Sequence, residues 1–351
     1  MADPSPCGST WLDDCLAGVR DVRVAVLGDF CLDAYWLIDP DESERSVETG
    51  LPVRRVRRQR YGLGGAGNIV ANLAALGVAE VHALGLVGDD LFGRHMVELL
   101  QGLGARCDAL LDGGEEWRTQ VYAKPCVGGD EDRRIDFGAF NEAAAGAVDD
   151  LIERLERLAG DVNAVIVNQQ IPAGVCRPEV IERVNAVVAA RPDRPFIADS
   201  RHRAERFGGC ILKVNAHEAA RLLGHPRSLD ERIPAAAARE MAKRLRDRSG
   251  RAAFVTRGEN GLIVADDGGL HEIPGIQRVE RTDPVGAGDT TVAALAAALA
   301  SGADAPTAGR LANVAASVVV RKLQTTGTAT PEEILRVGPE PDYVYLPELA
   351  D

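Results

Sequence analysis

Short apolar runs alternate with longer segments of helical periodicity along most of the chain. The runs expected to form buried strands are residues 22–27, 81–87, 164–168, 196–199, 210–214 and 253–256. Apolar residues at helical spacing predict helices at residues 69–76, 92–103, 142–158, 178–190, 217–223, 235–248, 289–300 and 306–323. This alternation is typical of a doubly wound α/β fold, in which helices cover both faces of a mainly parallel sheet.

Two segments interrupt the alternation, residues 51–60 and 117–137. They contain the strand-like stretches VRRVRR, TQVYAK and RRIDF, whose polar side chains fall on one side of the strand period. The pattern predicts a small antiparallel sheet beside the main body, and a mobile lid or an ordinary surface hairpin would both account for it. We expect one domain over residues 1–351, with lid segments at about 38–62 and 117–138 and a C-terminal tail at 332–351.

The composition of the 351 residues favours a globular enzyme without a nucleic-acid or membrane partner. Hydrophobic residues make up 46% of the chain and aromatic residues only 4%, so the core is expected to consist mainly of Ala, Leu and Val. The net charge of −13 gives no general attraction to nucleic acid or to anionic lipid. The basic stretch from Arg54 to Arg60 fits a solvated strand or a phosphate-binding patch equally.

The cysteines and the N-terminal residues predict a cytoplasmic protein. Seven scattered cysteines without a C-x-x-C pair are typical of free thiols in a reducing compartment. The first residues, MADPSPCGSTWLDDC, lack the basic start and apolar run of a signal peptide, and no apolar stretch is long enough to span a bilayer.

The stretch YGLGGAGN has the spacing of a dinucleotide-binding turn. Gly62, Gly64 and Gly67 form G-x-G-x-x-G, and Asp89 lies where such sites place the acid that holds a ribose. A dinucleotide turn follows a buried strand, however, and the preceding RRVRRQRY cannot be buried on both faces. Glycines followed by an amide side chain, here Asn68, suit a hydroxyl-rich ligand as well. A tight turn that binds no ligand is the alternative interpretation of YGLGGAGN.

A second glycine cluster, DPVGAGDTTVAALAAALA, begins at Asp283 and leads into an Ala/Leu helix. Unsatisfied N–H groups at the start of a helix, together with the helix dipole, stabilise an anion. Asp289, beside these donors, can take the proton of a substrate hydroxyl while the amides hold negative charge on a transferred phosphoryl group. From this motif alone, simple helix capping by Asp289 is the alternative.

Further motifs accompany this cluster in a specific order. GDFCLD, GGAGN, KVNAHE, VTRGENG and DPVGAGD follow one another, and together they resemble the ribokinase/PfkB family of sugar kinases over about residues 22–331. The resemblance implies a ribokinase-like three-layer α/β/α fold with a small antiparallel β lid. It also implies ATP and Mg²⁺ as cofactors, a sugar or sugar phosphate as substrate, and a homodimer formed through the lid. Because G-x-x-x-x-G-K-[ST] is missing from the sequence, a P-loop enzyme is excluded.

The resemblance also implies roles for individual residues. Asp289 would be the catalytic base, and the anion hole for the γ-phosphate would consist of Gly286, Ala287 and Gly288. The positions that hold the sugar are matched by Asp33, Gly64, Gly65 and Asn68. The nucleotide side is matched by Asn215, Thr256, Gly258, Gly261 and Asn313. Glu218 would organise Mg²⁺ through water, and Asp283 would bind a monovalent cation such as K⁺, although Val285 replaces the usual small polar residue there.

Within the family, GDFCLDAYW, GGAGN, RRIDF and VVVRKLQTTGTATPEE look most like the heptose-7-phosphate kinase branch. That branch phosphorylates the anomeric hydroxyl of D-glycero-D-manno-heptose 7-phosphate. Arg201 and Arg134 are candidates for holding the substrate phosphate, and each also fits a solvated surface residue. VNQQIP is closer to the ribokinase pattern, in which Gln170 would contact a sugar hydroxyl. Another sugar or nucleoside kinase, or a non-catalytic sugar- or nucleotide-binding protein, therefore stays open.

Overall fold

The structure is a computed structural model that describes residues 10–39, 41, 44–228, 230–276, 282–323 and 326–338. Within these residues a main sheet of nine strands has the order β14 (Gly269–Ile273), β13 (Leu262–Asp266), β12 (Ala253–Thr256), β11 (Ile211–Asn215), β10 (Phe196–Ser200), β9 (Ala164–Gln169), β1 (Arg23–Gly28), β4 (Glu80–Val87) and β5 (Arg106–Asp112). The strands from β12 to β5 are parallel, and β13 and β14 extend one edge in antiparallel pairing. The predicted mainly parallel sheet is confirmed.

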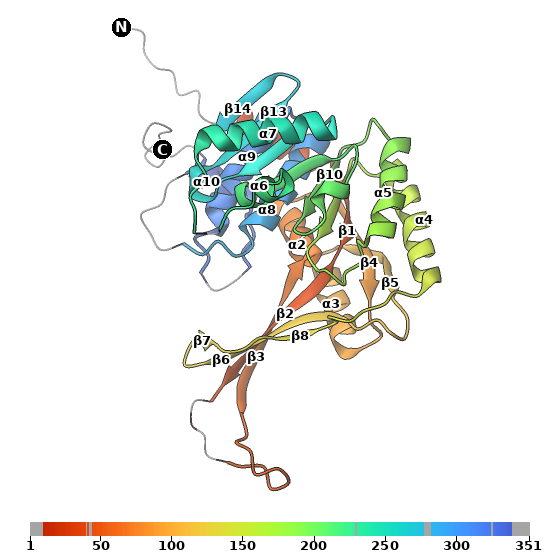
Figure 1. Cartoon of the computed structure of the whole chain (residues 1–351), viewed down its shortest axis with the longest axis vertical. Helices are drawn as coiled ribbons and strands as arrows, with labels where there is room; N and C mark the ends of the chain where they lie inside the picture. The colour runs from red at the N-terminus through yellow and green to blue at the C-terminus, as the bar shows by residue number, and fades with distance from the viewer. Residues whose placement is uncertain are drawn as a thin grey trace.

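Helices cover both faces of this sheet (Figure 1). One face carries α1 (Thr10–Val19), α2 (Ala66–Leu76), α3 (Leu91–Gly102), α8 (Ala287–Ala300), α9 (Ala305–Val319) and α10 (Pro331–Val337). The other carries α4 (Ala145–Asp161), α5 (Pro178–Ala190), α6 (Ala216–Leu222) and α7 (Ala235–Ser249). On β1, Val24 and Val26 face the first core and Ala25 and Leu27 face the second. Burial on both faces explains why the strands are continuous apolar runs.

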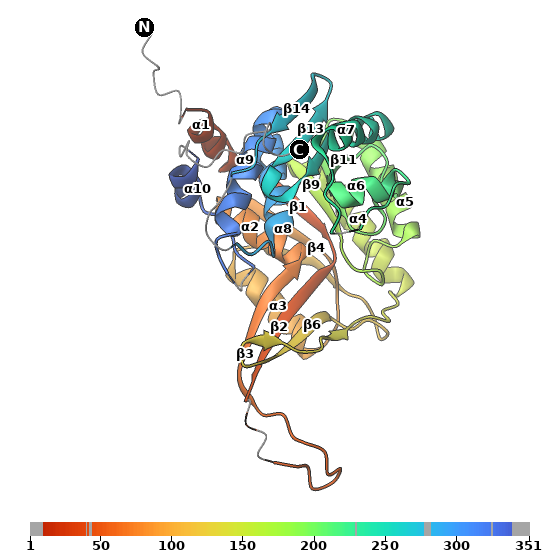
Figure 2. The same cartoon turned by 60° about the vertical axis from the view of Figure 1, so that its left-hand side comes forward.

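A second, smaller sheet extends from the main body (Figure 2). Among the described residues its strands are β2 (Phe30–Ile38), β3 (Val56–Gly65), β6 (Gln120–Val127), β7 (Asp130–Glu131) and β8 (Ile135–Phe137). β2 pairs in parallel with β6, and the other pairs are antiparallel. We call this sheet the lid. Its exposed arginines belong to a solvated strand: Arg57 pairs with Asp39 at 3.1 Å and Arg60 stacks on Tyr35 at 4.5 Å.

The segment from residue 332, predicted to be a tail, begins with helix α10. Thr330 caps this helix in a capping box with Glu333, and Ile334 is fully buried in the core. Lys322, three residues after the end of α9, forms an ion pair with Glu333, with 2.7 Å between Nζ and Oε1. The tail prediction is therefore wrong for residues 332–337, because an apolar helix face packs there, and residues 339–351 lie outside the described residues.

The predictions on thiols and on membrane segments concern the same described residues. The cysteines among them, Cys15, Cys31, Cys107, Cys126, Cys176 and Cys210, form no disulfide. Of the helices in the described ranges, none has the length and hydropathy needed to cross a bilayer.

Candidate active site

The candidate site lies where the carboxyl ends of the parallel strands meet the N-terminus of α8. Gly286 adopts a left-handed conformation with φ of 82° and caps the helix. The amides of Gly288 and Asp289 lie in the first turn, where no intrahelical acceptor exists, so they can bind an anion. The amide of Ala287 already donates to the Pro284 carbonyl at 3.2 Å. In the predicted anion hole, the donors would therefore be the neighbouring amides and not that of Ala287.

The Asp289 carboxylate connects this helix start to the first glycine cluster. Asn68, in the first turn of α2, donates a hydrogen bond from Nδ2 to Asp289 Oδ2 at 2.7 Å. Burial raises the pKa of Asp289 to about 6, and the nearby Asp199 charge adds to this. The Asn68 hydrogen bond and the charges of Lys213 and Arg201 act in the opposite direction. A carboxylate with such a pKa is ionised at neutral pH and still basic enough to accept a proton.

A short network fixes the side chain of Asn68. Asn72 donates from Nδ2 to the Asn68 side-chain Oδ1 at 3.4 Å and to the Asn68 backbone carbonyl at 2.9 Å. Thr290 donates from Oγ1 to Asn72 Oδ1 at 2.8 Å. These three residues are buried. The two glycine clusters are therefore joined by side-chain hydrogen bonds as well as by helix packing.

The first glycine cluster lies at the base of the lid. Gly64 faces Cys31 across the β2–β3 pair, and a Cβ there would lie 2.8 Å from Cys31 Sγ and 3.3 Å from Asp33 Oδ2. Asp33 itself pairs with Lys124 of β6, with 2.8 Å between Oδ1 and Nζ. The predicted sugar-side residues Asp33, Gly64, Gly65 and Asn68 thus come from β2, β3 and α2.

This placement does not fit a dinucleotide turn. Gly62 and Gly64 belong to lid strand β3, whereas a dinucleotide turn follows a strand of the main sheet. The Asp89 side chain is 81% exposed and pairs with Arg94 at 2.8 Å. Both observations argue against a dinucleotide site at YGLGGAGN.

A buried ion pair that sequence reasoning missed lies beside the anion-binding turn. Lys213 Nζ is 3.2 Å from Asp199 Oδ1, and both side chains are 7% exposed. A Cβ added to Gly288 would lie 3.2 Å from the same Nζ, so this ammonium borders the helix start. Burial lowers the pKa of Lys213, but Asp199, Glu218 and Asp289 outweigh it and raise the pKa overall. The signal in the sequence that could have revealed this ion pair is the charged Lys213 inside the otherwise apolar strand ILKVN.

The two candidate arginines lie around Tyr122 of the lid. Burial raises the pKa of Tyr122 to about 12, and the charges of Arg134 and Arg201 oppose this rise. Arg134 stacks on the Tyr122 ring at 4.2 Å and makes two bonds to Asp136, at 2.6 and 2.8 Å. Arg201 is exposed, and its charge also lowers the pKa of Asp289. Gln170 is half-buried nearby.

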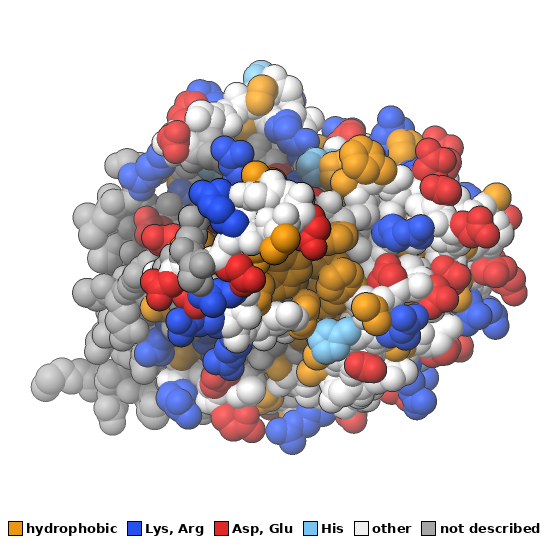
Figure 3. All heavy atoms as spheres, turned by 90° about the horizontal axis from the view of Figure 1, so that it is seen from below, with side chains coloured by type: hydrophobic (Ala, Val, Ile, Leu, Met, Phe, Trp, Pro, Cys, Tyr) orange, Lys and Arg blue, Asp and Glu red, His pale blue; other side chains and the backbone are white. Residues whose placement is uncertain are grey.

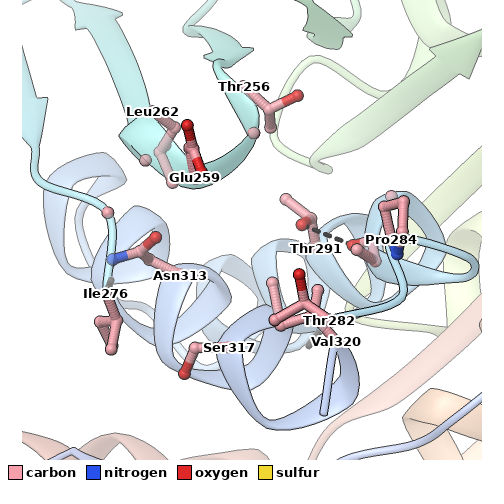
Figure 4. Close-up of a pocket in the computed structure, with 16 residues that line it drawn as sticks. Thr256, Glu259, Leu262, Ile276, Thr282, Pro284, Thr291, Asn313, Ser317 and Val320 are labelled. Atoms are coloured by element: carbon pink, nitrogen blue, oxygen red, sulfur yellow. Dashed lines mark hydrogen bonds between the residues drawn. The ribbon is translucent and has the colours of Figure 1, made fainter. Parts of the chain in front are cut away.

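A cavity of about 230 Å³ borders the N-terminus of α8. The sugar-side residues Asp33, Gly64, Gly65 and Asn68 are not among those that line it. Its walls include Thr256 at the end of β12, Gly258 and Gly261 from the segment that follows, and Ala287 and Gly288 at the start of α8. Figure 4 shows Thr256 and Glu259 on one wall and Asn313 and Ser317 on the opposite wall. Asn313 is held by a hydrogen bond from Nδ2 to the Pro274 carbonyl at 2.7 Å. Four of the predicted nucleotide-side residues therefore line one cavity.

The fifth, Asn215, is not among the residues that line this cavity and has a structural contact with Glu218. Asn215 Oδ1 accepts from the Glu218 amide at 2.9 Å, and Glu218 Oε2 accepts from the Asn215 amide at 2.8 Å. This capping box starts α6. Burial raises the pKa of Glu218, and Lys213 opposes the rise. The N-x-x-E motif thus has a local structural function whatever else it binds.

The predicted metal sites are sparse in protein ligands. Within the described ranges, no group of three or more His, Cys, Asp and Glu side chains is arranged to hold a metal ion. Asp283 Oδ1 accepts a hydrogen bond from the Val285 amide at 3.0 Å. Few protein ligands are compatible with Mg²⁺, which commonly relies on substrate phosphates and water.

The fold and the site are typical of a ribokinase-like protein, with a half-buried carboxylate beside an anion-binding helix start and a cavity of about 230 Å³. The sequence match to the pfkB family of carbohydrate kinases runs over residues 23–333. The chain belongs to this family of carbohydrate kinases.

Two kinds of relatives are similar along most of the chain. The bifunctional protein HldE of Halorhodospira halophila is 35% identical over 93% of this chain, and the D-beta-D-heptose 7-phosphate kinase of Bordetella bronchiseptica is 32% identical over 88%. This chain covers 94% of the second protein but 66% of the first. It spans about two thirds or less of the bifunctional relatives that it matches.

Solved structures agree on the fold. Phosphofructokinase-2 from Escherichia coli in complex with potassium matches 90% of this chain and 98% of its own, with a TM-score of 0.70 and 19% identity. Arabidopsis thaliana ribokinase complexed with ribose and ATP matches the same shares, with a TM-score of 0.65 and 20% identity. The predicted ribokinase-like fold is confirmed.

Proposed function

We propose that this kinase transfers the γ-phosphate of ATP to the anomeric hydroxyl of D-glycero-D-manno-heptose 7-phosphate and forms the 1,7-bisphosphate. The observation that carries the proposal is the position of Asp289, between the sugar-side Asn68 and the cavity-facing turn at Gly288. The name of the Bordetella relative, which is similar over nearly its whole length, supports the choice of acceptor.

In the proposed reaction Asp289 accepts the proton of the acceptor hydroxyl. The hydroxyl oxygen attacks the γ-phosphorus, the bond to the β-phosphate oxygen breaks, and ADP leaves. Negative charge on the transferred group is stabilised by the first-turn amides, with Gly286 and Gly288 leaving room for close approach. Lys213 adds a positive charge beside Gly288, and its ion pair with Asp199 keeps it there.

The adenosine part of ATP would occupy the cavity between the loop of Thr256, Gly258 and Gly261 and the α9 residue Asn313. Asn215, the last residue of β11, and Glu218, in the first turn of α6, are joined in their capping box. Lys213 lies two residues before Asn215 in the same strand. Glu218 would hold Mg²⁺ through water, and the ion would offset the charge of the phosphates. Asp283 remains the proposed ligand of a monovalent cation.

The sugar would lie between Asp33, Gly64, Gly65 and Asn68 under the lid. Gln170 would contact a hydroxyl and Arg201 the substrate phosphate, with Arg134 as a second phosphate ligand. Arg134 is already paired with Asp136, so Arg201 is the stronger candidate. As a check on the phosphate, Arg201→Gln is expected to raise KM for the phosphorylated heptose and not for the unphosphorylated sugar.

We also propose a homodimer formed through the lid. Hydrophobic side chains gather on the face of the molecule seen from the lid end (Figure 3). On the lid strands, Leu37, Val56, Ile135 and Phe137 are between 39% and 49% exposed. Sedimentation of the full chain tests this: a monomer at micromolar concentration would contradict it.

The main experiment is an acceptor screen with the purified full chain, ATP and Mg²⁺. Heptose 7-phosphate, the unphosphorylated heptose, ribose, fructose, fructose 6-phosphate and nucleosides are compared by ADP release. We expect release with heptose 7-phosphate and a product without a reducing end. Arg183→Gln, a surface arginine paired with Asp149, is the matched control for Arg201→Gln.

A second candidate rests on Gln170 and its neighbours in VNQQIP, which suit an unphosphorylated sugar. Activity confined to ribose, fructose or a nucleoside would favour this other family kinase. Saturable sugar or nucleotide binding without ADP release from any acceptor would instead favour a non-catalytic binding protein.

A further inference from the structure

Asp29 is a buried carboxylate for which the proposed chemistry has no use. It is 2% exposed and is the single residue between β1 and β2, where the chain passes from the main sheet into the lid. A charge at this depth is costly unless hydrogen bonds compensate it. Its partners therefore indicate what the charge holds in place.

The carboxylate binds one loop through three backbone amides. Asp29 Oδ2 accepts from the amides of Gln170 and Ile171, and Oδ1 accepts from the amide of Val175, each at 2.8 Å. All three belong to the connection between β9 and α5. A Cβ added to Gly174 would lie 2.1 Å from Oδ1, so the loop closes tightly around the carboxylate.

The backbone of the same residue holds the first glycine cluster. The Asp29 carbonyl accepts from the amide of Ala66, the first residue of α2, at 3.0 Å. A Cβ added to Gly65 would lie 2.4 Å from this carbonyl, and Gly65 has φ of 54°, which favours glycine. Through its amide, Asp29 also bonds the Asn168 carbonyl at 3.1 Å.

Three titratable groups interact with Asp29 besides these amides, namely Arg203, Cys176 and Cys31, whose thiol pKa the Asp29 charge helps to raise. Arg203, which donates to the Pro172 carbonyl at 3.0 Å, lowers the pKa of Asp29, while burial raises it to about 6. Cys176 lies close enough for the Asp29 charge to raise the thiol pKa. At neutral pH the carboxylate is thus ionised, and its three hydrogen bonds are charge-assisted.

We propose that Asp29 is a positioning residue for the acceptor subsite, whose carboxylate holds the loop from Gln170 to Val175 and whose carbonyl holds the turn at Gly65 and Ala66. It touches no reacting atom. Its effect passes through Gln170 on one side and through Asn68, two residues after Ala66, on the other. The inference rests on the proposed function in one respect, because it assumes that Gln170 and Asn68 bind the acceptor sugar.

The test is Asp29→Asn in the full chain, since an amide preserves shape but offers one acceptor oxygen for three N–H groups. We expect KM for the acceptor sugar to rise on the order of 10- to 100-fold, as for loss of a charge-assisted bond, and KM for ATP to stay within about twofold. Asp304→Asn is the matched control. Asp304 caps α9, accepts from the Thr307 amide at 2.8 Å, and follows the C-terminal end of α8, remote from the site.

A second variant keeps the test informative if Asp29→Asn folds poorly. Gly174→Ala disturbs the same contact from the loop side, and by itself it should raise KM for the acceptor sugar while KM for ATP stays within about twofold. Equal increases in both KM values, or a lower melting temperature with unchanged acceptor KM, would show a purely structural role and overturn the proposal.

Amide hydrogen exchange separates this proposal from the proposed function. In the unliganded enzyme, Asp29→Asn should reduce protection at Gln170, Ile171 and Val175, and Asp304→Asn should not. A wild-type enzyme that phosphorylates no sugar would overturn the proposed function alone. In that case, reduced protection at Gln170, Ile171 and Val175 in Asp29→Asn would still support the loop contact. Unchanged protection in Asp29→Asn would overturn the positioning role whatever the activity.

Discussion

Asn68 donates a hydrogen bond of 2.7 Å to Asp289 across 221 positions of sequence. The bond joins the turn proposed to hold the sugar to the helix start proposed to hold the transferred phosphoryl group. Because Asn72 and Thr290 extend it, the carboxylate is oriented before any ligand binds. Such preorganisation lowers the cost of reaching the transition state.

The first prediction concerns Asp289→Asn. We expect kcat to fall by about three orders of magnitude, because the amide cannot accept the hydroxyl proton while the surrounding donors remain. ADP release with the preferred acceptor measures this. Asp149→Asn, on the exposed side of α4, is the control and should match the wild type. Turnover of Asp289→Asn within tenfold of the wild type would rule out the proposed base.

The same variant has a stability signature that depends on pH. The folded-state pKa of about 6 lies above the ordinary value of 3.8, so the stability contribution of Asp289 is complete below pH 3.8 and is lost as the pH rises through 6. Asp289→Asn cannot ionise. In urea unfolding, the free energy of unfolding of Asp289→Asn should exceed that of the wild type most at pH 7–8 and less at pH 5. An advantage that grows at low pH would contradict the assignment.

The second prediction is an acid limb in the pH profile. Since burial raises the pKa of Asp289 to about 6, kcat/KM should fall roughly tenfold per unit below that pH. Asn68→Ala removes a hydrogen bond that lowers this pKa, so the limb should move to higher pH. Asn185→Ala, which loses an exposed bond to the Arg206 carbonyl, serves as control and should leave the limb in place.

The third prediction concerns the buried pair of Lys213 and Asp199. Lys213→Met leaves the Asp199 charge unpaired and should cost about 3–5 kcal/mol of unfolding free energy. Adding Asp199→Asn should restore much of the stability without restoring kcat/KM for ATP, because the ammonium beside Gly288 is still missing. Full recovery of activity in the double variant would show that the lysine is only structural.

The fourth prediction separates two roles of Glu218. Glutamine at the third helical position keeps a capping box, whereas alanine loses it. Glu218→Gln should thus retain the wild-type melting temperature and require more Mg²⁺ for half-maximal activity, while Glu218→Ala should show both defects. If Glu218→Gln has an unaltered Mg²⁺ requirement, capping accounts for the motif.

Much of the main sheet was predictable because its strands are buried on both faces. The strand at 253–256 and the helix at 178–190 have the predicted bounds, and the other predicted elements differ at their ends by up to four residues. Lid strand β2 was missed because Asp33 interrupts its apolar pattern. The tail was mispredicted because α10 is short and acquires its stability by packing.

The sequence by itself determined the class of fold, and it predicted an anion-binding turn before α8 with the acid at Asp289, because these depend on periodicity, on the order of the motifs and on local helix geometry. Only the tertiary structure decided which distant groups surround that acid. Asn68, Lys213 and Asp29 derive their roles from contacts made where parallel strands end and the lid begins. Burial, which raises the pKa of Asp289 and makes the hydrogen bonds of Asp29 necessary, exists only once those segments have packed together.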